Sequence, residues 1–222
     1  VPSFHVHELR AEGLRPVVRA PAAATATWCG TATEADRTPN VLAGNPVHWI
    51  YAIPFNATDR FPTVASLMQT DGEAIDAWWR REDPARTPRN DLTPLSCGAQ
   101  LDLTSLRFGQ GSGQFESDFG FGQIMDSLGD SGFDSPATKY VVYYDGAVAE
   151  GEEDVCGRGG TLQGGVGLAV VYLQACIGVS TATVAAHELL HTLGAVPDEA
   201  PNGCEGHVCD DPRDLMYASL GD

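Results

Sequence analysis

Apolar and polar positions along the chain predict strands and helices in mixed order. Apolar residues occupy every second position over 47–55, which indicates a strand with one buried face. Apolar residues then recur at helical spacing, which predicts an amphipathic helix over 63–82. A strand over 101–108 and a short helix around 121–128 follow, and Gly129 is the expected end of that helix.

The second half of the chain adds two apolar runs and one more helix. Lys139–Asp145 and Val166–Ala175 are predicted strands. Gly146–Gly165, between them, is acidic and rich in glycine and is predicted to be a loop. Thr181–Gly194 is the next predicted helix, and 195–222 is irregular. This order of elements indicates one α/β or α+β domain.

We expect three parts within that single domain. Residues 1–46 are rich in Pro, Ala and Thr and are predicted to be an extended N-terminal arm. Residues 47–194 carry the sheet and the helices, and 195–222 form the C-terminal segment.

Composition and charge exclude several classes of partner. The 222 residues include 30 acidic and 13 basic side chains, for a formal net charge of −17. No basic patch could neutralise phosphates, so we expect no nucleic-acid partner. No apolar run approaches the roughly 20 residues that span a bilayer, so we expect no membrane association.

Six cysteines point to an oxidising compartment. An even number fits three disulfides, and a start at Val1 suggests that a leader was removed, so a secreted, extracellular protein is expected. Many pairings are open. Cys204–Cys209 is favoured because both residues flank one short loop, and Cys29 is expected to pair, with Cys97 as the candidate partner.

The chemistry of the chain is concentrated in the helix predicted at its C-terminal end. His187 and His191 are four residues apart, so their imidazoles lie on one face of that helix, an arrangement that suits Zn²⁺. Glu188 lies beside the first ligand, where its carboxylate can take a proton from a water that the metal activates. Ala182, Ala186, Leu189 and Leu193 form the opposite, apolar side of the helix.

Two further residues extend the motif. Gly194 follows the second histidine by three positions, and Met216 lies in an Asp-Leu-Met-Tyr segment downstream. The set His187-Glu188-x-x-His191-x-x-Gly194 with Met216 resembles the metzincin clan of zinc endopeptidases. The resemblance implies an α+β fold in which a twisted mixed sheet has a backing helix and an active-site helix. It also implies that Val166–Ala175, or the strand before it, forms the upper rim of a substrate cleft.

The resemblance also implies a third metal ligand, and here the chain departs from the clan pattern. The pattern places that ligand at position 197, which is Pro197, a residue that cannot bind a metal. We favour His207 over Asp198, because imidazole is the commoner zinc ligand and a local disulfide would hold its loop. Some secreted bacterial relatives have a similar Gly-His-x-x-Asp segment, in which Asp210 could orient the ring.

Other candidates are weaker. Met216 is expected to pack beneath the metal, and Tyr217 either hydrogen-bonds a tetrahedral intermediate or is a core or rim residue. A solvated loop is favoured over a Ca²⁺ site for the acidic residues Glu150, Glu152, Glu153 and Asp154. We place three histidines outside the site, with an exposed arm as the setting of the first two: His5, His7 and His48.

The sequence therefore predicts a secreted, monomeric zinc endopeptidase that acts on a protein or peptide substrate. Its predicted metal ligands are His187, His191 and His207, and Glu188 is the general base. Two alternatives remain open. One is a binding module that holds zinc or calcium without proteolysis, and the other is a zinc hydrolase of a non-peptide substrate.

Overall fold

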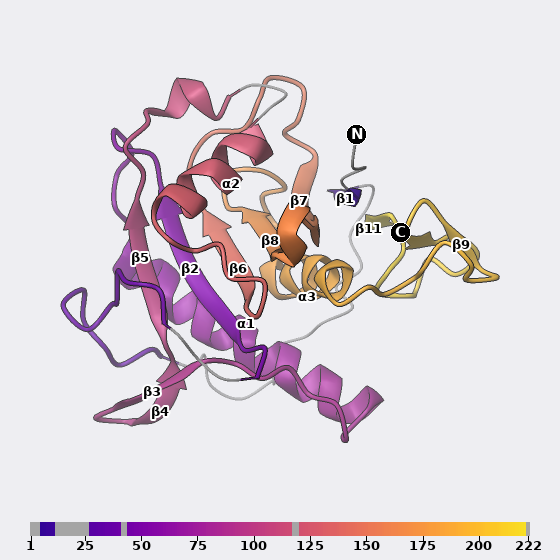
Figure 1. The fold of residues 1–222 in the computed structure, drawn as a ribbon, viewed down its shortest axis with the longest axis horizontal. Coiled ribbons are helices and arrows are strands. Elements are labelled where there is room, and N and C mark those ends of the chain that lie inside the picture. Colours follow the sequence, from indigo (N-terminus) through magenta and orange to yellow (C-terminus); the bar gives the residue numbers. More distant parts are fainter. Residues whose placement is uncertain (1–4, 12–26, 41–43, 117–119, 221–222) are drawn as a thin grey trace.

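A seven-stranded mixed β-sheet forms the centre of the structure, with helices on both faces (Figure 1). The computed structural model describes residues 5–11, 27–40, 44–116 and 120–220. The order of strands across the sheet is β11-β1-β7-β8-β6-β2-β5. Their bounds are β1 (His5–Ala11), β2 (Val47–Ile53), β5 (Leu103–Arg107), β6 (Lys139–Tyr144), β7 (Val155–Thr161), β8 (Gly167–Tyr172) and β11 (Ser219–Leu220).

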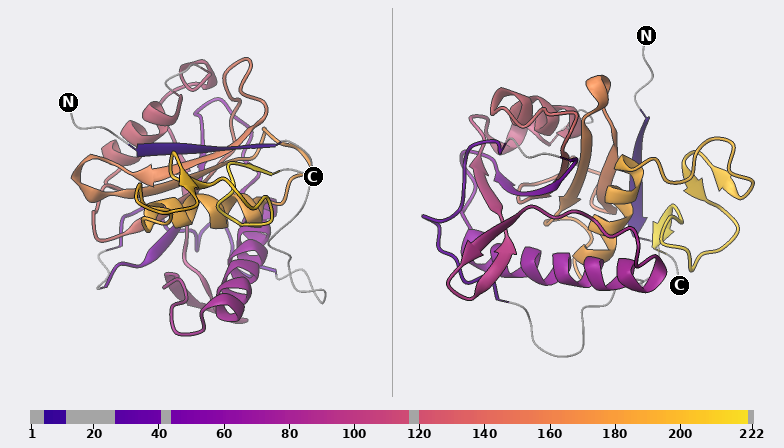
Figure 2. Two further views of the ribbon diagram at one scale, coloured as in Figure 1. Left: turned by 90° about the vertical axis from the view of Figure 1, so that its right-hand side faces the viewer. Right: turned by 60° about the horizontal axis from the view of Figure 1, so that its bottom comes forward.

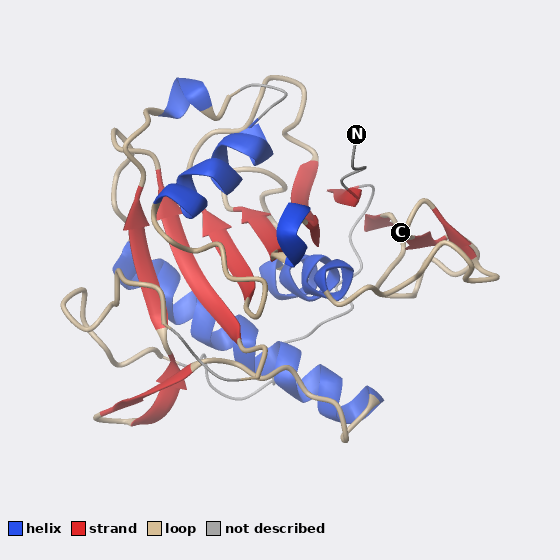
Figure 3. Ribbon diagram, viewed as in Figure 1, coloured by secondary structure: helices blue, strands red, loops and turns tan. Residues whose placement is uncertain are grey.

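Parallel and antiparallel pairs occupy different parts of this sheet. β5, β2, β6 and β8 run parallel to one another. β7 runs antiparallel to both β8 and β1, and β11 runs parallel to β1. Figure 3 shows the strands between helices, which confirms an α+β fold built on a mixed sheet.

The helices divide between the two faces. α1 (Phe61–Glu82) and α3 (Thr181–Thr192) pack on one face, and α2 (Gly120–Asp130) packs on the other (Figure 2). Two short 3₁₀ turns and two small hairpins complete the elements: η1 (Ser112–Gln114), η2 (Gln163–Gly165), β3 (Leu92–Leu95) with β4 (Gly98–Leu101), and β9 (Gly203–Cys204) with β10 (His207–Val208). Within the described part of the chain, no helix combines the length and the apolar character needed to cross a membrane.

Helices on both faces bury the central strands completely. All seven residues of Val47–Ile53 are buried, so the prediction that this strand buries only one face is wrong. The polar residue His48 of this strand is also buried. Its ring forms hydrogen bonds with the Asp91 carboxylate at 3.0 Å and with the Thr104 hydroxyl at 2.7 Å. These contacts give His48 a structural role.

The predicted helices are present, with changes of one or two residues at their ends. α1 begins two residues before the predicted range. α2 continues through Gly129, so the expectation that this glycine ends the helix is wrong. The turn after α2 is made instead by Gly132, whose φ of 87° is a conformation that glycine adopts readily.

Two strands of seven residues each were not expected from the pattern. β7 lies inside the segment predicted as a loop, and β1 lies inside the predicted N-terminal arm. β8 is flanked by β6 and β7, so it has no free edge, and the expectation that Val166–Ala175 forms a cleft rim is wrong. The predicted strand before it is β6, which is also interior.

All six cysteines form disulfides. The pairs are Cys29–Cys97, Cys156–Cys176 and Cys204–Cys209, which confirms both predicted pairings and adds a third. Three disulfides in a chain of this size are typical of proteins that mature in an oxidising, extracellular-type environment.

Candidate metal centre

α3 is held rigidly at both ends, which fixes the direction of its histidines. At its start, the Ser180 side chain accepts a hydrogen bond from the Thr183 backbone N–H. At its end, Gly194 has a φ of 75° and donates to the His191 carbonyl, while the N–H of Ala195 donates to the Leu190 carbonyl. These two bonds form a Schellman motif, so Gly194 ends the helix as predicted.

The apolar side of α3 packs as predicted with one exception. Ala182, Ala186 and Leu189 are buried in the core that α3 shares with α1 and the sheet. Leu193 is 50% exposed, so its predicted place on the buried face is wrong. It lies just beyond the last helical residue, where the chain turns away from the sheet.

A tight hairpin presents the third histidine. Between β9 and β10, Glu205 and Gly206 have φ values of 49° and 80°, the pair of positive values that a type I′ turn requires. The turn places His207 opposite Cys204, and the Cys204–Cys209 disulfide closes the loop around it. The local disulfide therefore fixes the histidine's backbone.

The imidazoles of His187 and His207 both approach that of His191 beside α3. The Nε2 atom of His191 lies 3.0 Å from Nε2 of His187 and 3.2 Å from Nε2 of His207. Nδ1 of His187 bonds to the Leu215 carbonyl oxygen at 2.6 Å. Because a carbonyl can only accept, Nδ1 carries the proton, and Nε2 of His187 presents its lone pair to the other two rings.

The surroundings keep these rings neutral. Burial, and then the neighbouring imidazoles, lower the pKa of His187 to about 3, against the opposing effect of its bond to Leu215. Burial also lowers the pKa of His191 and of His207, and nearby histidines add to the effect. A neutral imidazole is the form that binds a metal, so the cluster can hold a cation.

Glu188 lies beside this cluster without a hydrogen-bond partner. It is completely buried, and both of its carboxylate oxygens are unpaired. One oxygen lies within 4.8 Å of a ligand nitrogen of each of His187 and His191. Burial raises the pKa of Glu188 well above its ordinary value, while Arg158 opposes the rise. A buried, unpaired carboxyl next to a metal-binding cluster is typical of a functional group.

Glycines on β7 make room for this carboxylate. A Cβ atom on Gly159 would lie 2.7 Å from one Glu188 oxygen, and a Cβ atom on Gly157 would lie 2.8 Å from the other. The hydrophobic pattern did not predict β7 because the strand is rich in glycine. These same glycines let α3 pack closely against it.

Of the other residues singled out in the sequence, Met216 and Tyr217 lie next to the hairpin that carries His207. Met216 is buried, and its carbonyl accepts from the Val208 N–H at 2.8 Å, which ties the Met216 segment to the hairpin. Tyr217 is half-buried and forms a bridge with Val208.

Asp198 and Asp210 are exposed, and the Glu205 backbone, rather than Asp210, hydrogen-bonds to His207. Of the two candidates for third ligand, the structure brings His207 to the cluster.

The acidic residues weighed as a calcium site serve other roles. Glu152 pairs with Arg158, and Asp154 pairs with Arg10. Among the described residues, the groups of His, Cys, Asp and Glu close enough to hold a metal are two overlapping sets. They are His187–Glu188–His191 and His7–His191–His207.

His7 is the site residue that sequence reasoning missed. Its ring stacks on His191 with centroids 4.4 Å apart and meets the edge of His207 at 5.3 Å. Its assignment to an exposed arm is therefore wrong. The signal was present in the run His-Val-His-Glu-Leu-Arg over 5–10, where every second residue faces the same side of a strand. The side chain of His5 lies outside the described residues.

Comparisons with known proteins do not assign the chain to a family. No family model matches the sequence, and no curated protein matches it. Among solved structures, two crystal forms of wild-type OgpA from Akkermansia muciniphila are similar, with TM-scores of 0.42 and 0.43 and identities of 12% and 14%. The alignments cover 72% and 73% of this chain but 52% and 53% of that one, so the chain spans about half the length of OgpA. TM-scores of this size do not establish a shared fold.

Proposed function

We propose that the protein is a zinc-dependent endopeptidase of the metzincin type. The observation that carries the proposal is the close approach of two neutral imidazoles to a third, next to a buried, unpaired carboxyl. His187 and His191 come from one helix, His207 comes from the disulfide-closed hairpin, and Glu188 lies one residue from the first ligand.

The donor set suits zinc. Two nitrogens bound to one tetrahedral zinc ion at about 2.0–2.1 Å lie about 3.3 Å apart. The separations of 3.0 Å and 3.2 Å from the His191 nitrogen are close to this value. Imidazole without thiolate or oxygen ligands fits zinc far better than calcium, which binds oxygen.

The residues around the ion would divide the chemistry between them. Bound zinc would supply Lewis-acid chemistry, polarising the scissile carbonyl and acidifying a water molecule. Glu188 would accept the proton of that water and deliver it to the leaving amine. The Leu215 carbonyl, by fixing the proton on Nδ1 of His187, holds that ring in the orientation that a ligand needs.

Other features support the same proposal. The α1 and α3 helices on one face of a mixed sheet, the glycine that ends α3 and the buried Met216 agree with the metzincin resemblance. The three disulfides favour a secreted enzyme. We propose that it acts as a monomer on a protein or peptide substrate.

The substitution Glu188→Gln tests the assignment. The amide keeps the shape of the side chain but cannot take a proton, so turnover of a quenched peptide library should fall at least about 100-fold. Zinc content, measured by elemental analysis, should remain at one ion per chain. Cleavage by the unmodified protein should stop when a chelator is added and return with zinc.

A matched control is Glu199→Gln, because Glu199 is exposed on the loop after α3. This variant should keep both zinc and turnover. Retained turnover in Glu188→Gln would overturn the role of Glu188. A protein that binds no zinc after reconstitution would overturn the proposal as a whole.

A further inference from the structure

We propose that His7 is a fourth ligand of the metal held by His187, His191 and His207. We further propose that β1, by occupying the outer edge of β7, keeps the site closed to substrate. The second half of this inference rests on the proposed function, while the first half concerns metal ligation alone.

The metal-binding part follows from the position of His7 within the cluster. A ring nitrogen of His7 lies within 4.8 Å of ligand nitrogens of both His191 and His207. The ring is half-buried and packs over Gly206, where a Cβ atom would lie 2.2 Å from it. Four protein ligands close a zinc site, whereas a catalytic site keeps one position open for water or substrate. A ring nitrogen close to two of the three proposed ligands places His7 beside the cluster, where it could supply the fourth ligand.

The register of β1 explains why His7 reaches this point. His7 pairs with Gly159, and Leu9 pairs with Gly157, the two glycines that lie against the Glu188 carboxylate. The same face of β1 thus points at α3, and Leu9 is completely buried there. At this register, the side chain of His7 faces both Glu188 and the proposed histidine ligands.

β1 also occupies the place where a peptide would pair with the sheet. Without β1, the outer edge of β7 would carry unpaired N–H and C=O groups, which is how an extended peptide adds to a sheet. β1 satisfies this edge in antiparallel register, and the C-terminal strand β11 pairs with its other side (Figure 2). A substrate that brings its carbonyl to the metal along β7 must first displace β1.

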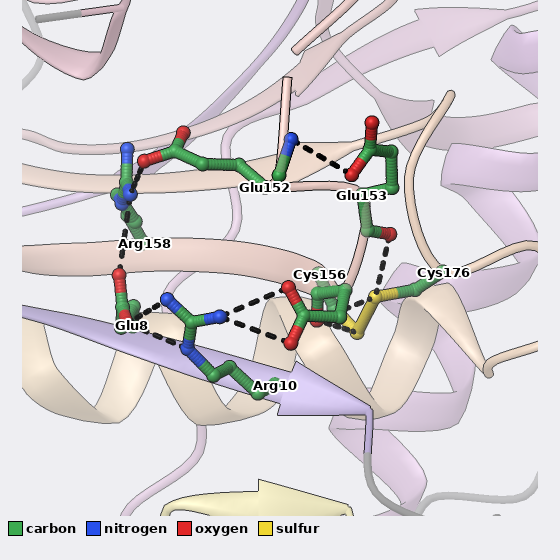
Figure 4. A network of polar contacts seen from close by, with 9 residues as sticks. Glu8, Arg10, Glu152, Glu153, Cys156, Arg158 and Cys176 are labelled. Carbon is green, nitrogen blue, oxygen red and sulfur yellow. Dashed lines mark hydrogen bonds and ion pairs between the residues drawn. A yellow bond between two sulfur atoms is a disulfide. The ribbon is translucent and has the colours of Figure 1, made fainter. Parts of the chain in front are cut away.

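Charged side chains fasten β1 to β7 on the face away from α3. Arg10 donates two hydrogen bonds of 2.9 Å to the Asp154 carboxylate, and Glu8 accepts from Arg158 at 3.2 Å. Arg158 also donates to Glu152 (Figure 4). The Arg10–Asp154 and Glu8–Arg158 pairs join residues 144 and 150 positions apart in the chain. They hold the strand without any covalent link between β1 and β7, so it can be released while the sheet remains.

The direct test counts imidazoles at the metal in the whole chain. X-ray absorption of the zinc protein should show four imidazole ligands, and His7→Ala should reduce them to three with an oxygen ligand in addition. Zinc affinity, measured by competition with a chelating dye, should fall at least about tenfold. In the cobalt-substituted protein, acetohydroxamate should change the visible spectrum of His7→Ala at concentrations that leave the unmodified protein unchanged.

Two further variants keep the test decisive. Val6→Ala alters the neighbouring residue of β1, which is exposed on the other face, and should leave four imidazoles at the metal. His7→Gln retains a side chain of similar length and polarity, so it replaces His7→Ala if the alanine variant does not fold. Three imidazoles in the unmodified protein would overturn the ligation.

Turnover separates this inference from the proposed function. His7→Ala should hydrolyse the quenched peptide library faster than the unmodified protein, and the double variant with Glu188→Gln should not. One outcome is that the number of imidazole ligands falls from four to three in His7→Ala while no variant hydrolyses peptides. That outcome would support His7 as a ligand and overturn the proposed endopeptidase function. A second outcome is chelator-sensitive hydrolysis at the same rate in His7→Ala and in the unmodified protein. That outcome would support the endopeptidase function and overturn the proposal that β1 closes the site.

Discussion

Asp71 is a buried carboxyl that joins three elements around the start of α3. It lies on α1 and accepts hydrogen bonds from the Tyr143 hydroxyl on β6 at 2.7 Å and from the Thr181 hydroxyl on α3 at 2.5 Å. Burial raises its pKa to about 6, although both hydroxyls oppose the rise. The position of α3 thus depends on a group that is costly to ionise.

This gives a prediction for the pH dependence of stability. The folded pKa of about 6 exceeds the ordinary value of 3.8, so the folded state binds the proton more tightly than the unfolded state. The contribution of Asp71 is therefore most favourable below pH 3.8, declines as the pH rises through 6, and is then constant. The whole change is about 3 kcal/mol in the free energy of unfolding.

Asp71→Asn should remove this dependence, because the amide oxygen still accepts a hydrogen bond and nothing ionises. Urea unfolding of both proteins with disulfides intact and metal removed should show a difference that grows in favour of the variant between pH 4 and pH 7. Other titrating groups are common to both proteins and cancel in the difference. A difference that is flat across this range would contradict the pKa assigned to Asp71.

Single residues also decide what could be read from the sequence at the site. The spacing of His187, Glu188 and His191 is a property of the helix and needs no tertiary information, so it could be predicted. His207 could be favoured from its chemistry and its flanking cysteines. The unpaired state of Glu188 could not, because it depends on two glycines of a strand that only the folded sheet brings beneath it.

At the scale of elements, the strands of the sheet centre and all three helices could be predicted, because their apolar residues follow one period. β7 and β1 could not. Val-Cys-Gly-Arg-Gly-Gly-Thr has few side chains that favour a strand, and its burial comes from α3. β1 is mostly polar and does not alternate strictly, and its pairing with a strand about 150 residues away depends on the tertiary structure.

The β9–β10 hairpin, which carries His207, is an element whose geometry depends on its disulfide. It pairs only two residues from each strand, so it has little stability of its own, and Cys204–Cys209 closes it around His207. The double substitution of these cysteines by alanine should weaken zinc binding by roughly 10-fold, because His207 is no longer held in position. Competition with a chelating dye measures this.

The matched comparison is the double alanine variant of Cys29 and Cys97. That disulfide lies in the region of the β3–β4 hairpin, away from the histidines, and its loss should leave zinc affinity unchanged. Equal affinities in both double variants would mean that the hairpin holds His207 without its disulfide.

At the scale of the whole molecule, the histidine cluster brings the N-terminal strand and the C-terminal segment together at α3. α3 is packed into the main core, whereas the described part of the C-terminal segment consists mostly of turns and two-residue strands. His207 brings that segment to α3, and His7 brings the N-terminal strand to the same point. A bound ion would therefore stabilise the fold as a clamp between the two ends of the chain and its centre.

Metal removal should accordingly lower the thermal stability of the whole protein. A ligand present at about 100 times its dissociation constant adds about 2.7 kcal/mol, which corresponds to roughly 5–10 °C for a domain of this size. Calorimetry with and without a chelator measures the shift. Hydrogen exchange should show the loss of protection concentrated in β1 and in 195–220, while β2, β6 and β8 stay protected. His187→Ala, which removes a ligand inside α3, should weaken zinc binding and so reduce the shift that the chelator causes; a shift of unchanged size in this variant would place the metal elsewhere.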